Sequence, residues 1–110
     1  MDSTSLPRLV TEHLAKAESS SAGRSAHTVY GGQEHSLRQT LIALAEGRGL
    51  DDHESPGEAT LQVLQGRVTL GTADRTWEGS AGDHLVIPLE RHDLRALEPS
   101  AVLLTVALRR

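Results

Sequence analysis

The fold of this chain is decided by residues 47–66, which read Gly47-Arg48-Gly49-Leu50-Asp51-Asp52-His53-Glu54-Ser55-Pro56-Gly57-Glu58-Ala59-Thr60-Leu61-Gln62-Val63-Leu64-Gln65-Gly66. The residues before Pro56 are mostly polar, which is typical of a turn. After Gly57, Leu61 and Val63 alternate with polar residues, which is typical of a strand with one buried face. The stretch therefore predicts a polar turn that carries His53, followed by a strand over residues 60–65.

A second informative block lies further along the chain, and it reads Gly82-Asp83-His84-Leu85-Val86-Ile87-Pro88-Leu89-Glu90-Arg91-His92. Together the two blocks resemble the two signature motifs of the cupin superfamily. The residues of the first motif that fall in register are Gly47, His53, Pro56, Val63, Leu64 and Gly66. Those of the second motif are Gly82, Asp83, Ile87, Pro88 and His92. The second block lacks the Gly that the family usually has between Pro88 and His92.

The resemblance implies an all-β fold, a double-stranded β-helix jelly-roll barrel. Short apolar or alternating runs separated by Gly and Pro agree with a sandwich or barrel, although periodicity alone does not select the jelly roll. We expect strands over residues 27–30, 37–45, 60–65, 67–70, 76–78, 84–87, 94–97 and 101–108. Before them, Leu6, Val10 and Leu14 recur at helical spacing, which predicts a short amphipathic helix. We therefore expect a helix and linker over residues 1–22 and a barrel over residues 23–110.

The resemblance also implies a candidate metal site. Metal-binding cupins use two His and a Glu from the first motif and one His from the second, a set that suits Zn, Fe, Ni or Mn. This chain keeps His53 and His92, but it has Ser55 and Ala59 at the other two positions. The nearest carboxylate is Glu58, one residue early, and a shift of one residue points a strand side chain to the opposite face. Glu58 completes the site only if a bulge near Pro56 swings it inward.

Other polar residues are candidates for ligand binding. Gln39 and Gln62 lie within otherwise apolar predicted strands, where a buried amide would need partners and would orient a small polar ligand. The alternative is that either side chain faces solvent. We expect His13, His35 and His84 to lie on the surface.

Composition excludes several classes of partner. The chain has 110 residues, no Cys and a formal net charge of −4. Its basic residues are scattered and it has one Trp and one Tyr, so there is neither a stripe for a phosphate backbone nor a stacking platform for bases. We therefore expect no nucleic-acid partner. No stretch resembles a signal peptide or a membrane span, which predicts a cytoplasmic protein without a membrane partner.

Three classes of function remain open. The first is a barrel that binds a small polar ligand through His53 and His92, either directly or through a weakly held divalent metal. The second is a metal-dependent enzyme of the dioxygenase or isomerase type that acts on a small molecule. The third is a non-catalytic structural or sensor barrel. The replaced metal ligands favour the first class, and the sequence does not decide whether the protein is an enzyme.

The predicted strand over residues 37–45 has two apolar faces. Leu37, Leu41 and Ala43 lie on one face, and Thr40, Ile42 and Leu44 lie on the other. A small barrel has one interior, so the outer apolar face needs a cover. The N-terminal helix and a second subunit are both candidates, and we favour the second subunit. The sequence thus predicts a homodimer.

Overall fold

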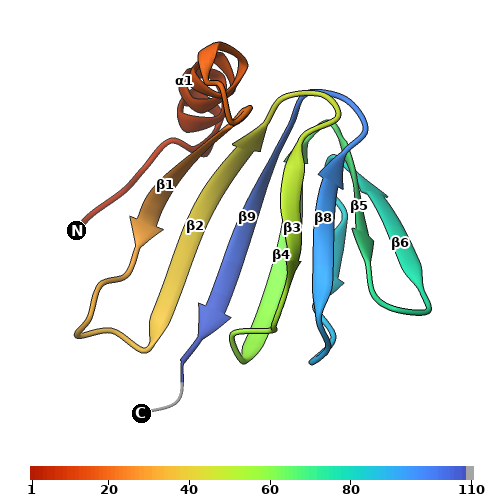
Figure 1. Ribbon diagram of the computed structural model, residues 1–110. Coiled ribbons are helices and arrows are strands. Elements are labelled where there is room, and N and C mark those ends of the chain that lie inside the picture. Colours follow the sequence, from red (N-terminus) through yellow and green to blue (C-terminus); the bar gives the residue numbers. More distant parts are fainter. Residues whose placement is uncertain (109–110) are drawn as a thin grey trace.

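The structure, a computed structural model, describes residues 1–108. Within these residues one helix precedes two antiparallel sheets (Figure 1). The elements are α1 (Leu6–Ser19), β1 (Arg24–Tyr30), β2 (Leu37–Leu44), β3 (Gly49–His53), β4 (Glu58–Gln65), β5 (Arg67–Gly71), β6 (Thr76–Ser80), β7 (His84–Val86), β8 (His92–Ala96) and β9 (Ser100–Ala107). The all-β fold with a short N-terminal helix is confirmed.

The two sheets pack face to face around one apolar interior. The larger sheet has the strand order β1-β2-β9-β4-β7, and the smaller has the order β3-β8-β5-β6. Inward side chains of both sheets form the core, among them Ile42, Leu61, Val63, Leu70, Leu94 and Val102. Strand β3 was not predicted, because it reads Gly-Leu-Asp-Asp-His and contains a single apolar residue. It forms because its backbone pairs with β8, which propensity does not report.

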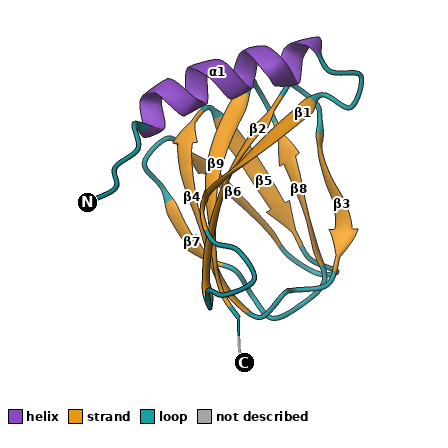
Figure 2. Ribbon diagram, turned by 90° about the vertical axis from the view of Figure 1, so that its left-hand side faces the viewer, coloured by secondary structure: helices purple, strands orange, loops and turns teal. Residues whose placement is uncertain are grey.

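The helix runs from Leu6 to Ser19, in the region where the spacing of Leu6, Val10 and Leu14 predicts it. The Ser5 hydroxyl accepts a hydrogen bond of 3.3 Å from the backbone N–H of Arg8, which caps the first turn, and Pro7 lies within that turn. One face of the helix is buried and consists of Val10, His13, Leu14 and Ala17. Figure 2 shows this helix lying across the outer face of the larger sheet, at one end of β1, β2 and β9.

The helix covers part of the outer face of β2. Leu41 and Ala43 point outward and pack with Val10, Leu14 and Ala17, whereas Ile42 and Leu44 point into the barrel. For Leu41 and Ala43 our preference for a second subunit as the cover was therefore wrong, but Leu37 on the same face is not covered by the helix. The homodimer itself stays a prediction. Outside the helix, Tyr30, Leu37 and Val86 remain exposed on the larger sheet.

His13 is buried, contrary to the expectation that it lies on the surface. It is 5% exposed on the buried face of the helix, and its Nδ1 lies 2.7 Å from the hydroxyl of Ser25 on β1. The ring of His27 lies 5.1 Å away, centroid to centroid. Burial lowers the pKa of His13, the positive charge of Lys16 and the neighbouring His27 lower it further, and Glu12 opposes them. The side chain of His13 therefore lies in the contact between the helix and the sheet, and not on the surface.

Among residues 1–108 no helix is long and apolar enough to cross a membrane. The cytoplasmic location stays a prediction.

Docking of the helix predicts the effect of shortening a buried side chain. Leu14→Ala should lower the free energy of unfolding by about 2 to 4 kcal/mol, because it removes buried methyl groups and leaves a cavity against β2. Glu18→Ala, on the exposed face of the same helix, should change it by less than about 0.5 kcal/mol. Urea unfolding monitored by circular dichroism measures both values. Equal stability of the two variants would mean that the helix contributes no buried contact.

His13 predicts a loss of stability in acid. Its pKa is lowered in the folded state, so below the ordinary value of 6.5 the unfolded chain takes up a proton that the folded chain does not. The stability that depends on a neutral His13 is present above pH 6.5, and it is lost as the pH drops from 6.5 toward the pKa of His13 in the folded protein. Urea unfolding at pH 7.5, 6.5 and 5.5 should show a smaller fall for His13→Gln than for the unchanged protein. His84→Gln, at an exposed position, serves as the control and should keep the full fall.

A candidate ligand site inside the barrel

Two histidines from separate motifs meet on neighbouring strands. Strands β3 and β8 run side by side (Figure 1), and His53 lies directly opposite His92 in their antiparallel register. The two rings lie 4.5 Å apart, centroid to centroid, at an interplanar angle of 63°. His92 is 4% exposed, and His53 is half-buried. The sequence-predicted pair is thus brought together.

The sequence near His53 is what permits this close pairing. At the start of β3, Gly49 lies opposite Arg95, and the backbone carbonyl of Leu94 occupies the space that a Cβ on Gly49 would need. Only a glycine allows the two backbones to approach in this way. The register is irregular between Leu50 and His53, so the strand pairs at both of its ends and bends between them.

Backbone carbonyls fix the tautomer of both rings. His53 Nδ1 lies 2.7 Å from the carbonyl oxygen of Asp51, and His92 Nδ1 lies 2.8 Å from that of Glu90. A carbonyl oxygen can only accept a hydrogen bond, so each Nδ1 carries the proton and donates it. In the neutral ring, Nε2 is then an acceptor. Within residues 1–108 neither Nε2 has a hydrogen-bond partner.

The two rings line an apolar cavity of about 240 Å³. Its walls come from both sheets and consist mainly of Ile42, Leu50, Pro56, Leu61, Leu70, Ile87, Leu94 and Leu104. The polar residues that line it are His53, Glu54 and His92. This wall is more apolar than the polar ligand site expected from the sequence.

Glu54, which lines this cavity, belongs to a cluster of paired charges. The Arg91 guanidinium Nε lies 2.9 Å from a carboxylate oxygen of Asp52, and its Nη1 lies 3.5 Å from one of Glu54. The Glu54 side chain is 81% exposed, so its carboxylate points toward solvent. Sequence reasoning did not identify this ion pair, because nothing in the spacing of the residues links position 54 to position 91.

Glu58 does not lie with the two histidines. In β4 the side chains of Ala59, Leu61 and Val63 point into the core, and Glu58, Thr60 and Gln62 alternate with them. Glu58 is exposed and pairs with Ala107, whereas the buried Ala59 pairs with Val106. The bulge that would turn Glu58 inward is absent at this end of the strand, so Glu58 as a third metal ligand is not supported by the fold.

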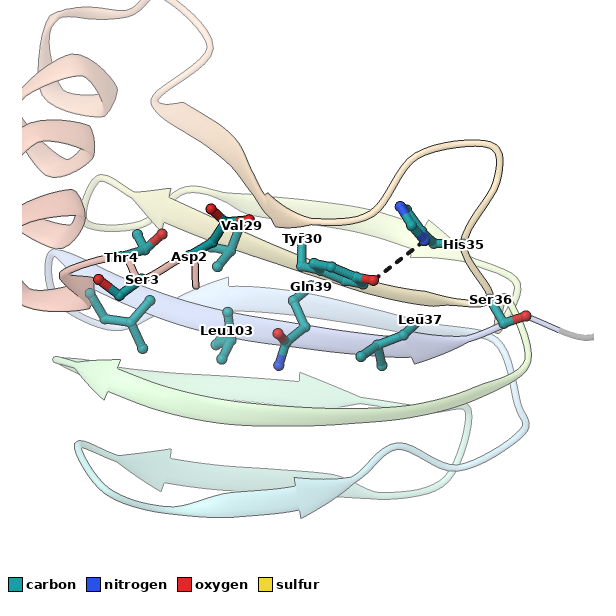
Figure 3. Close-up of a pocket in the computed structure, with 11 residues that line it drawn as sticks. Asp2, Ser3, Thr4, Val29, Tyr30, His35, Ser36, Leu37, Gln39 and Leu103 are labelled. Carbon is teal, nitrogen blue, oxygen red and sulfur yellow. Dashed lines mark hydrogen bonds between the residues drawn. The ribbon is translucent and has the colours of Figure 1, made fainter.

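The two glutamines also lie away from the histidine pair. Gln62 is exposed on the outer face of β4. Gln39 donates a hydrogen bond of 3.3 Å to the Thr105 hydroxyl and lines an open groove of about 650 Å³ on the outside of the larger sheet. Figure 3 shows this groove, with Gln39 and Leu37 on one strand and Tyr30 beside His35. In this groove Gln39 and the Tyr30–His35 pair thus have hydrogen-bond partners, whereas the Nε2 atoms of the histidines that line the barrel cavity have none within residues 1–108.

The residues present supply half of the metal-ligand set of the family. Ser55 donates a hydrogen bond of 3.0 Å to the Gly57 carbonyl, and Ala59 has no donor atom. No group of three or more His, Cys, Asp or Glu residues within residues 1–108 is placed to hold a metal ion. Two imidazoles without a third protein ligand do not fit a tightly bound resident metal.

Neither a scan against protein-family models nor a search of curated proteins finds a match for this sequence. The fold does find matches among solved structures. A conserved protein of unknown function from Streptococcus pyogenes superimposes with a TM-score of 0.73 at 26% identity, covering 83% of this chain and 79% of that one. A cupin superfamily protein from Desulfitobacterium hafniense gives 0.71 at 16% identity and 78% coverage of both chains.

A third match is an RmlC-like cupin protein from Desulfovibrio desulfuricans. It superimposes with a TM-score of 0.67 at 24% identity, covering 76% of this chain and 81% of that one. At identities this low, the structural similarity establishes the fold and leaves the activity open. The sheet order agrees with these neighbours, and the chain has the fold of small cupin proteins.

Proposed function

We propose that this protein binds a small molecule inside the barrel, with His53 and His92 as its polar contacts. The observation that carries the proposal is that His53 and His92, whose Nε2 atoms have no hydrogen-bond partner within residues 1–108, both line an apolar cavity of about 240 Å³. Among the described residues no buried side-chain nitrogen or oxygen lacks a partner, so these two Nε2 atoms remain accessible to a bound molecule. A ligand supplies the missing partner.

The enzyme alternative is less well supported. A metal-dependent dioxygenase or isomerase needs a set of protein ligands that holds the metal and leaves positions open for substrate. The register of β4 turns Glu58 away from the pair, and the Glu54 carboxylate is paired with Arg91 in solvent. Binding without metal chemistry requires only the two rings and the cavity.

Toluene tests whether the cavity accepts a ligand. An engineered cavity of about 150 Å³ binds benzene, so the larger barrel cavity has room for toluene. Millimolar toluene should shift the side-chain NMR resonances of Leu61, Leu70 and His92, which line the cavity. The resonances of Tyr30 and Gln39 in the outer groove are the internal control and should stay unchanged. Shifts confined to the outer groove would contradict the proposal.

A second candidate is a weak and exchangeable divalent transition metal at the same pair. The observation that favours it is the Nδ1 hydrogen bond of each ring to a backbone carbonyl, because metal-binding histidines commonly use such bonds to present Nε2. The metal would be Zn, Fe, Ni or Mn, held by His53 and His92 with water in the remaining positions.

Titration with Zn²⁺ and Ni²⁺ distinguishes a two-ligand site from a complete one. Binding should be weak, it should disappear in the double variant His53→Ala/His92→Ala, and it should be unchanged in Glu58→Ala. It should also weaken as the pH falls, because imidazole must be neutral to bind a metal. His84→Ala, on the outer face, is the matched control. Isothermal calorimetry measures each affinity, and a loss of binding in Glu58→Ala would show that the two-ligand description is wrong.

A further inference from the structure

We infer that the ligand of the barrel is an uncharged amphipathic molecule, with an apolar body about the size of a benzene ring and one O–H or N–H group that donates a hydrogen bond to His53 or His92. This inference rests on the proposed function and adds the chemical class of the ligand to it. Three features of the site carry the inference, namely the direction of its hydrogen bonds, the charged residue in its lining, and the size and apolar walls of its cavity.

The direction of the hydrogen bonds selects a donor. Both Nδ1 atoms donate to main-chain carbonyls, at 2.7 Å from His53 to Asp51 and at 2.8 Å from His92 to Glu90. Each neutral ring therefore presents a lone pair on Nε2. A carboxylate or phosphate oxygen would place its own lone pairs against them, whereas a hydroxyl or amide N–H forms a hydrogen bond.

The charged residue that lines the cavity disfavours an anion as well. Among the described residues, Glu54 is the only charged residue in the cavity lining. The nearby charges are already paired, because the Arg91 guanidinium binds Glu54 and Asp52. Its Nη2 also donates a hydrogen bond of 3.2 Å to the Asp52 carbonyl. An anionic ligand would meet net negative charge and no available cation.

The lining and volume of the cavity determine the polarity and size of the ligand's body. Eight aliphatic or proline side chains line it, so a molecule with many hydroxyl groups, such as a sugar, would leave most of them unpaired. Since a cavity of about 150 Å³ holds benzene, about 240 Å³ holds a ring with one small substituent. A neutral phenol, or an alcohol of similar size, fits both the lining and the acceptor pair.

Phenol and toluene test this inference, because they have the same shape and differ by a hydroxyl in place of a methyl group. At pH 8 phenol keeps its proton and imidazole is neutral. NMR titration gives the ratio of the two affinities in the unchanged protein, in His92→Leu, in His53→Leu and in the double variant His53→Leu/His92→Leu. The ratio of phenol to toluene affinity should fall about tenfold in the double variant, because the hydroxyl then has no acceptor. Toluene binding should persist, which shows that each variant keeps its cavity.

Benzoate supplies the anionic arm of the experiment, and His84→Leu on the outer face is the matched control. Benzoate should bind more weakly than phenol at pH 8, and the control should keep the ratio of the unchanged protein. An unchanged ratio in the double variant His53→Leu/His92→Leu, or benzoate as the tightest of the three probes, would overturn the inference and leave the proposed function standing. Failure of all three probes to shift the cavity resonances would instead overturn the proposed function.

Discussion

The central strands are anchored by a contact between Ser100 and the turn after β4. Ser100 is fully buried at the start of β9, and its hydroxyl accepts a hydrogen bond of 3.1 Å from the Arg67 backbone N–H. Gly66 adopts a φ of +85° in that turn, and a Cβ there would collide with Ser100. Because both faces of β2 are apolar, alternation cannot set its register against β9. The Ser100 contact anchors the start of β9, the end that pairs with Leu44, to the turn after β4.

The same register determines the composition of the site. It points Ile42, Leu61 and Leu104 toward the histidine pair, where they form the floor of the cavity. It also places Ala59 inward and Glu58 outward. A shift of one residue would exchange the two positions and bring a carboxylate to the rings. The apolar cavity and the loss of the third ligand are therefore two results of one strand alignment.

The sequence predicts most of the fold because its motifs are local. The turns at Pro56 and Gly66, the alternation in β4 and the helical spacing near Leu14 each report on a few neighbouring residues. What it did not predict depends on distant pairing. Strand β3 is held by the backbone of β8, and His13 is buried because the helix docks on β1. The apolar character of the cavity likewise arises from side chains of six strands and the loops beside them, so no single segment shows it.

Replacement of two metal ligands changes what the remaining histidines can bind. With a carboxylate beside them, two imidazoles hold a divalent cation, and the cation then attracts anionic oxygen ligands. In the function that we propose, the Nε2 atoms act instead as hydrogen-bond acceptors and favour a neutral donor. The carbonyls of Asp51 and Glu90 hold both rings through Nδ1. The pairing of the two rings follows from the register of β3 and β8, whereas the residue at position 59 lies on β4, so the two features can vary independently.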